Sequence, residues 1–180
     1  DVSHHRTVAA PAGWRGGPGT HPFATGAWRA PGNNTNTFAR ESHVDILAAA
    51  AGLDPVEFRL RNLSDAKMRG VLQAAADRFS WRTAKAPSGR GQGIACGIDA
   101  GTFVALAAEV EVDRSSGRVR VRRLVCAQDM GLVINPAGAV IQMEGCLTMG
   151  LGYALTEELR FKGGEVLDRN FDTYEIPRFS

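Results

Sequence analysis

The chain has 180 residues, with 21 lysines and arginines against 19 aspartates and glutamates, and 44% of its residues are hydrophobic. This length suits one domain or a compact pair of domains. The near balance of charge disfavours a nucleic-acid-binding protein, because such proteins carry a concentrated basic surface. The basic run RVRVRR at 118–123 instead has the alternation of a strand with charges on its solvent face.

Cys96, Cys126 and Cys146 are far apart and form no CxxC pair, so the chain encodes neither a zinc site nor an iron–sulfur cluster of its own. We expect the three thiols to be small buried hydrophobic groups rather than disulfide partners. No apolar run of about 18 residues predicts a membrane span, and the sequence shows no signal peptide. The first residue is Asp rather than Met, which favours a processed or partial chain.

Residues 1–34 are rich in glycine and proline and predict an irregular, loop-rich arm. A first helix is predicted from Thr35, its expected N-cap, to a cap at Gly52. A second helix follows Asp54, with Pro55 at its first position, where proline is tolerated best. A third helix is predicted at 65–81, where one apolar stripe contains Met68, Val71, Leu72, Ala75 and Phe79.

After a linker at 82–93, the runs TFVALAAEVEVD and RVRVRRLVCAQD alternate with a period of two and predict a hairpin turning at RSSG. A long helix follows, with Asn135 as N-cap and Pro136 in its first turn. A short hairpin is predicted around Gly163 and Gly164, and an extended end over 170–180. The fold class is therefore α+β, with helices packed on a mixed or antiparallel sheet, helical at 35–81 and hairpin–helix–hairpin at 94–180.

No GxSxG, HExxH or P-loop motif occurs, and GRGQG at 89–93 lacks the strand and helix that a dinucleotide-binding motif requires. Two other segments are candidates for a site. In TGAWRAPGNNTN, Arg29 precedes the start of a helix, whose dipole and free N–H groups favour an anion or a carbonyl oxygen. The alternative is a loop arginine that donates to main-chain carbonyls, and the residues alone leave both open.

The second segment is DMGLVINPAGAVIQMEG at 129–145. Its helix brings Gln142, Gly145, Cys146 and Met149 onto one face, which we expect to be buried. A buried amide without a partner costs about 1–3 kcal/mol, so Gln142 needs either a neighbouring backbone group or a polar ligand. A glycine one turn along leaves room for either.

At these residues the chain resembles the molybdopterin-binding subunit of the xanthine dehydrogenase and aldehyde oxidase superfamily. The resemblance is closest to the bacterial isoquinoline 1-oxidoreductase and nicotinate dehydrogenase type. The matching motifs cover the chain from about residue 20 to its end: GAWRAPGNN, FARESHVDILAAAAGLDPVEFRLRNL, VLQAAADRFSW, GRGQGIACG, VALAAEVEVDRSSGRVRVRRLVCAQDMGLVINP, QMEG, GLGYALTEEL and NFDTYEIPR.

The resemblance implies an oxidoreductase in which molybdenum, held by a pterin nucleotide such as the cytosine dinucleotide, hydroxylates an N-heteroaromatic or aldehyde substrate with water as oxygen source. It also implies an iron–sulfur partner subunit that takes the electrons. Residues 35–180 would then be part of a molybdopterin-binding domain, completed by the remainder of the subunit. The expected location is the bacterial cytoplasm or periplasm, with no membrane span and no nucleic acid among the partners.

Carried over by motif, Gln142 matches the glutamine that hydrogen-bonds the cofactor, with Gly145 beside it. Arg29 and Ala30 match the turn that lines the cofactor, and Trp28 and Pro31 border the substrate pocket. The family's catalytic glutamate is expected beyond Ser180, so no catalytic residue and no metal ligand is assigned within this chain. The rival interpretation is a non-catalytic remnant that keeps the fold and docks on another chain.

Overall fold

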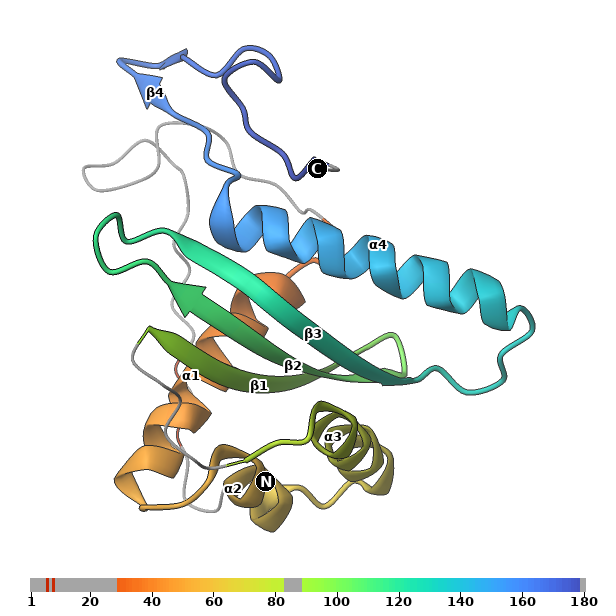
Figure 1. The fold of residues 1–180 in the computed structure, drawn as a ribbon. Coiled ribbons are helices and arrows are strands. Elements are labelled where there is room, and N and C mark those ends of the chain that lie inside the picture. Colours follow the sequence, from red (N-terminus) through yellow and green to blue (C-terminus); the bar gives the residue numbers. More distant parts are fainter. Residues whose placement is uncertain (1–5, 7, 9–28, 83–88, 179–180) are drawn as a thin grey trace. The chain divides into compact units, whose positions relative to one another are not determined.

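The computed structural model describes residues 6, 8, 29–82 and 89–178. Within these residues the chain forms four helices and five strands, in the order α1, α2, α3, β1, β2, β3, α4, β4 and β5 (Figure 1). They belong to two compact units that divide after Leu132. The first unit contains α1 to α3 and a three-stranded sheet, and the second contains α4 and a two-stranded hairpin. Most of the arm predicted at 1–34 lies outside the described residues.

Helix α1 (Asn33–Ala50) begins two residues before the predicted N-cap. Its N-cap is Gly32, and the prediction of Thr35 was wrong. The Ala30 carbonyl accepts a hydrogen bond from the Asn33 amide at 3.1 Å, so the chain already turns before Thr35. The start of α1 is therefore set by a backbone turn rather than by a capping side chain.

Helices α2 (Pro55–Asn62) and α3 (Ala66–Phe79) begin where aspartates cap them. The side chains of Asp54 and Asp65 each accept two backbone N–H hydrogen bonds from the first turn, at distances between 2.8 and 3.2 Å. The predicted cap at Asp54 and the apolar stripe of the third helix are confirmed. All five residues of that stripe are buried: Met68, Val71, Leu72, Ala75 and Phe79.

The sheet of the first unit contains β1 (Arg90–Asp99), β2 (Thr102–Val112) and β3 (Val119–Asp129), antiparallel and in that order. The predicted hairpin of β2 and β3 is confirmed, and its turn at 113–117 is closed by the Gly117 amide, which donates to the Asp113 carbonyl at 2.7 Å. Strand β1 was not predicted. Its glycines resemble a linker, yet it pairs with β2 along its whole length.

Figure 1 shows α3 on one face of this sheet, and the core of the first unit lies between them. Ala105 and Ala107 of β2 are fully buried, and such small side chains let the helix approach the strands closely. The core residues of α3 pack there with Ile94 and Cys96 of β1. Burial raises the pKa of the Cys96 thiol to about 12, so this cysteine behaves as a small hydrophobic residue, as expected.

A buried ion pair joins α1, α2 and β1. The Arg59 side chain is 3% exposed and donates to Glu41 Oε2 at 3.0 Å and to Asp45 Oδ1 at 2.7 Å. The same Glu41 oxygen accepts the Cys96 backbone N–H at 2.9 Å, while Arg40 Nη2 donates to the Cys96 carbonyl at 3.4 Å. Helix α1 is thereby fixed to β1.

In the second unit, α4 (Pro136–Leu155) begins as predicted, with Asn135 as N-cap and Pro136 at its first position. The Asn135 side chain accepts the Gly138 amide at 2.9 Å. The predicted hairpin is also confirmed: β4 (Phe161–Lys162) and β5 (Glu165–Val166) pair across Gly163 and Gly164. No described helix is both long and apolar enough to cross a membrane.

The end of α4 is held by the C-terminal segment. A Cβ atom at Gly152 would lie 2.9 Å from Pro177 Cδ and would also overlap the Glu157 carboxylate, so a glycine is required here. Glu157 Oε2 accepts a hydrogen bond from the Tyr174 hydroxyl at 2.8 Å, and this bond raises the pKa of Tyr174. Glu157 therefore has a structural role.

The C-terminal segment is less extended than predicted. The Asn170 carbonyl accepts hydrogen bonds from the Thr173 and Tyr174 amides at 3.1 and 2.9 Å, which makes a turn. Before this turn, Asp168 is 6% exposed and accepts the Arg160 backbone N–H at 2.6 Å and its guanidinium at 2.5 Å. These hydrogen bonds hold the pKa of Asp168 at about 2, so its carboxylate stays charged near neutral pH.

Replacing Arg59 should lower the free energy of unfolding of the first unit. In Arg59→Leu, Glu41 loses its buried cationic partner, and breaking such a pair costs about 3–5 kcal/mol. The control is Arg61→Leu on the same helix, whose exposed pair with Glu57 contributes at most about 1 kcal/mol. Hydrogen exchange of the α3 and β1 backbone amides in the complete complex measures both losses, because it reports the local free energy of opening. Equal losses in the two variants would contradict this account of the ion pair.

Removing the Glu157 charge should lower the pKa of Tyr174. In Glu157→Gln the hydroxyl loses its bond to a carboxylate, so the tyrosinate forms at lower pH. The chain has two tyrosines, so absorbance titration of tyrosinate resolves the change. Glu158→Gln, on the adjacent exposed residue, is the control and should leave the titration as it was. An unchanged Tyr174 titration in Glu157→Gln would show that the bond does not form in solution.

Candidate functional site

The sequence-predicted site residues fall in both units. Arg29, Ala30 and Pro31 belong to the first unit, and Gln142 and Gly145 belong to the second. The two groups are therefore described separately.

Two of the positions named from the sequence lie outside the described residues. They are Trp28, expected beside the substrate, and Ser180, beyond which the catalytic glutamate is expected. The role of Trp28 and the place of that glutamate stay predictions.

The turn before α1 has a strained backbone. Ala30 has φ +53°, which costs about 1–2 kcal/mol for a residue with a Cβ atom. Such conformations persist where the surrounding structure holds them, and they are frequent at binding sites. Gly32, with φ +75°, is the N-cap of α1 and contributes no side-chain hydrogen bond to the helix start. Arg29 and Pro31 are exposed beside it.

This turn is anchored to the sheet close to its tip. Asn33 Nδ2 donates to Asp99 Oδ1 at 2.8 Å, across 66 residues of sequence. Asp99 is the last residue of β1, so the first turn of α1 lies against the end of that strand. The dipole of an 18-residue helix and an exposed guanidinium beside its start both favour an anionic group.

The segment that leads into α4 is exposed and apolar. β3 ends at Asp129, whose Oδ1 accepts the Gly131 amide at 3.0 Å, and Gly131 takes φ +77° to make the turn. Leu132 and Ile134 follow and are 87% and 84% exposed. Where such exposed apolar side chains form a contiguous patch, the patch often marks a surface that another protein segment or a ligand covers.

Gln142 lies on the exposed surface of α4, so the prediction of a buried face was wrong for the described chain. Among the described residues of α4, Gly152 alone is buried, although the helix is apolar on most sides and Val140 and Ile141 are exposed. A helix that is apolar around its circumference belongs in the interior of a larger protein. The face was misjudged because the sequence cannot show what covers a helix.

The Gln142 carboxamide has one intrahelical partner and open space beside it. Its Nε2 donates to Cys146 Sγ at 3.4 Å, one turn along the helix. A Cβ atom at Gly145 would meet no heavy atom within 4 Å outside its own helix backbone. Cys96 is buried, Cys126 is half-buried and Cys146 is exposed, so the prediction that all three thiols are buried is confirmed for Cys96 alone. The remaining amide hydrogen and Oε1 can face a ligand.

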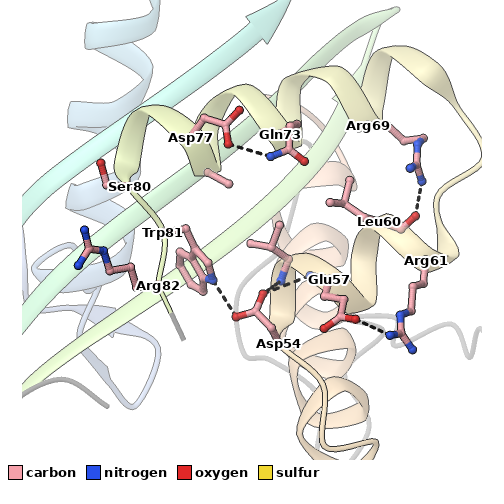
Figure 2. A pocket seen from close by; sticks show the side chains of 12 residues that line it. Asp54, Glu57, Leu60, Arg61, Arg69, Gln73, Asp77, Ser80, Trp81 and Arg82 are labelled. Carbon is pink, nitrogen blue, oxygen red and sulfur yellow. Dashed lines mark hydrogen bonds and ion pairs between the residues drawn. The ribbon is translucent and has the colours of Figure 1, made fainter. Parts of the chain in front are cut away.

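A separate cleft of about 940 Å³ lies between α2 and α3 and is shown in Figure 2. Trp81 Nε1 donates to Asp54 Oδ2 at 2.9 Å, and Gln73 Nε2 donates to Asp77 Oδ1 at 2.8 Å. Arg69 donates to the Leu63 carbonyl at 3.0 Å. These groups bind one another, and none of the predicted site residues lines the cleft. We assign it to packing of the two helices.

Taken separately, each group of residues has chemistry that suits one part of a pterin nucleotide. A carboxamide such as that of Gln142 can pair with the amide-like edge of a pterin ring, and a guanidinium at a helix start suits the phosphates of the nucleotide. Within the described residues, no three histidine, cysteine or acidic side chains lie together as a metal site.

Comparison with known proteins gives the family. A family model described as the molybdopterin cofactor-binding domain matches residues 36–180. The chain is 34% identical to a nicotinate dehydrogenase subunit of Pseudomonas putida, over 88% of this chain and 15% of that protein.

Two further relatives have related names. Identity is 36% with the beta subunit of isoquinoline 1-oxidoreductase from Brevundimonas diminuta, over 79% of this chain and 19% of that protein. Identity is 28% with the aldehyde oxidoreductase molybdenum-binding subunit PaoC of Escherichia coli, over 89% of this chain and 23% of that protein. The chain thus spans less than a quarter of each of these relatives. The resemblance inferred from the motifs is confirmed, and the chain belongs to the molybdopterin cofactor-binding domain family, as a homologue of oxidoreductase subunits.

Proposed function

We propose that this chain forms part of the cofactor pocket of a molybdenum hydroxylase that oxidises an N-heteroaromatic or aldehyde substrate. The names of the relatives support this class of substrate, since they include nicotinate, isoquinoline and aldehyde enzymes. When bound, the molybdenum–pterin group would supply the redox chemistry, with water as the source of oxygen and an iron–sulfur partner subunit as the electron acceptor. The chain's own residues bind and orient that group.

The exposed carboxamide of Gln142 is the observation that carries the proposal. It lies beside the open space at Gly145, on an apolar helix whose surface is uncovered in this chain. A carboxamide can donate and accept at once, which suits the edge of a pterin. In the complete protein the apolar surface around it would exclude water, and hydrogen bonds in a dry environment are stronger than in water.

The turn at Ala30, in the first unit, is a separate region that we propose binds the cofactor. The Arg29 guanidinium and the start of α1 would bind the anionic nucleotide end of the cofactor, with Pro31 and Trp28 bordering the substrate. The strained φ of Ala30 supports this assignment, because local strain is tolerated where function requires a fixed backbone.

The uncovered apolar surface of α4 also suits the rival function, a non-catalytic module that docks on another chain. In that case Gln142 would contact protein rather than cofactor. The two functions differ in what the loss of this one carboxamide does to the cofactor content of the complex.

Gln142→Ala should reduce molybdenum and pterin content, and activity with them, by about tenfold or more, since groups that support a metal site typically contribute 10- to 100-fold. The measurement is metal and pterin analysis of the complete complex, purified from cells that make the cofactor. The matched control is Thr148→Ala on the same exposed helix, where the Thr148 hydroxyl donates to its own helix at the Glu144 carbonyl. Full cofactor content in Gln142→Ala would favour the docking module.

A further inference from the structure

The contact between Gln142 and Cys146 fixes the orientation of the Gln142 carboxamide. An exposed glutamine side chain rotates freely, and its amide can turn over so that oxygen and nitrogen exchange places. A partner that accepts a hydrogen bond but donates one only weakly favours the orientation in which the amide nitrogen, rather than the oxygen, points toward it. The Cys146 sulfur is such a partner, because a thiol is a weak donor and its sulfur accepts the Nε2 hydrogen at 3.4 Å.

The geometry of α4 makes this contact local and independent of other elements. Residues four apart lie on the same helical face, so the thiol is within reach of the carboxamide without any tertiary contact. Gly145, between them in sequence, adds no side chain, and the space next to its Cα is open. On this exposed part of α4, the Cys146 side chain can therefore orient the Gln142 side chain without help from other elements.

We propose that Cys146 is a positioning residue for Gln142: its sulfur holds one amide hydrogen and leaves Oε1 and the second hydrogen for the cofactor. This inference rests on the proposed function, since it concerns the same carboxamide. Cys146 itself does not touch the cofactor in this account. Its effect passes through Gln142 alone.

The experiment is a double-mutant cycle in the complete complex, with molybdenum and pterin content and the electron paramagnetic resonance signal of the molybdenum as readouts. Cys146→Ala removes the acceptor and should lower cofactor retention by about two- to tenfold, the range of one neutral hydrogen bond. Cys146→Met keeps a sulfur that accepts and cannot donate, and should restore retention and the resonance signal. Thr148→Ala is the matched control and should change neither.

The double-mutant cycle distinguishes a failure of the positioning role from a failure of the proposed function. In a Gln142→Ala background, Cys146→Ala should have no further effect, because the residue acts only through the carboxamide. If Gln142→Ala itself leaves cofactor content unchanged, the proposed function fails. If Gln142→Ala lowers it but Cys146→Ala does not, or if the two losses simply add, the function stands and the positioning role is overturned. Failure of Cys146→Met to restore retention also overturns it.

Discussion

The structure of the first unit depends on one buried carboxylate. Glu41 accepts hydrogen bonds from Arg59 of α2 and from the Cys96 amide of β1, so three elements meet at its side chain. Two charges buried together stabilise little by themselves, but each fixes the position of the other, since either one alone would be costly. Two turns before Glu41, helix α1 begins at the turn that carries Arg29 and Ala30. The ion pair therefore fixes the helix that follows the proposed Arg29 and Ala30 contact region.

In the second unit, by contrast, most of the described surface of α4 is exposed. A helix with an apolar surface on most sides and one buried residue is stable only as part of a larger assembly. The relatives are several times longer than this chain, which agrees with that requirement. The Gln142 carboxamide belongs to this uncovered surface. Its role therefore depends on which cofactor or protein segment completes the surface.

Local chemistry made most of the fold predictable. The side chains of Asp54 and Asn135 cap helices because their oxygens accept the free N–H groups of a first turn, and that rule needs no tertiary information. Strand β1 escaped prediction because its glycines suggest a linker, while its stability comes from pairing with β2. The start of α1 was misplaced because the Ala30 carbonyl, a backbone group, makes the turn.

The site was less predictable than the fold. Motif resemblance points to Gln142 as a proposed cofactor contact, but the pattern of α4 could not show that its face is uncovered. The ion pair between Glu41 and Arg59 was not predicted. Glu41, Asp45 and Ala48 share one helical face, and two acidic residues beside a small apolar one could have indicated that a buried cation lies against this face. Cys146 was predicted to be a buried hydrophobic group, because nothing in its spacing showed that the face would be open.

Hydrogen exchange of the complete complex, with and without its cofactor, tests whether the cofactor contacts the Arg29 turn and the Gln142 helix, because it reports on backbone amides in both regions. We expect cofactor binding to slow exchange over 29–36 and 130–146, while exchange in α3 stays the same. Unchanged exchange in both regions, in a complex shown to contain molybdenum and pterin, would contradict the proposed contacts.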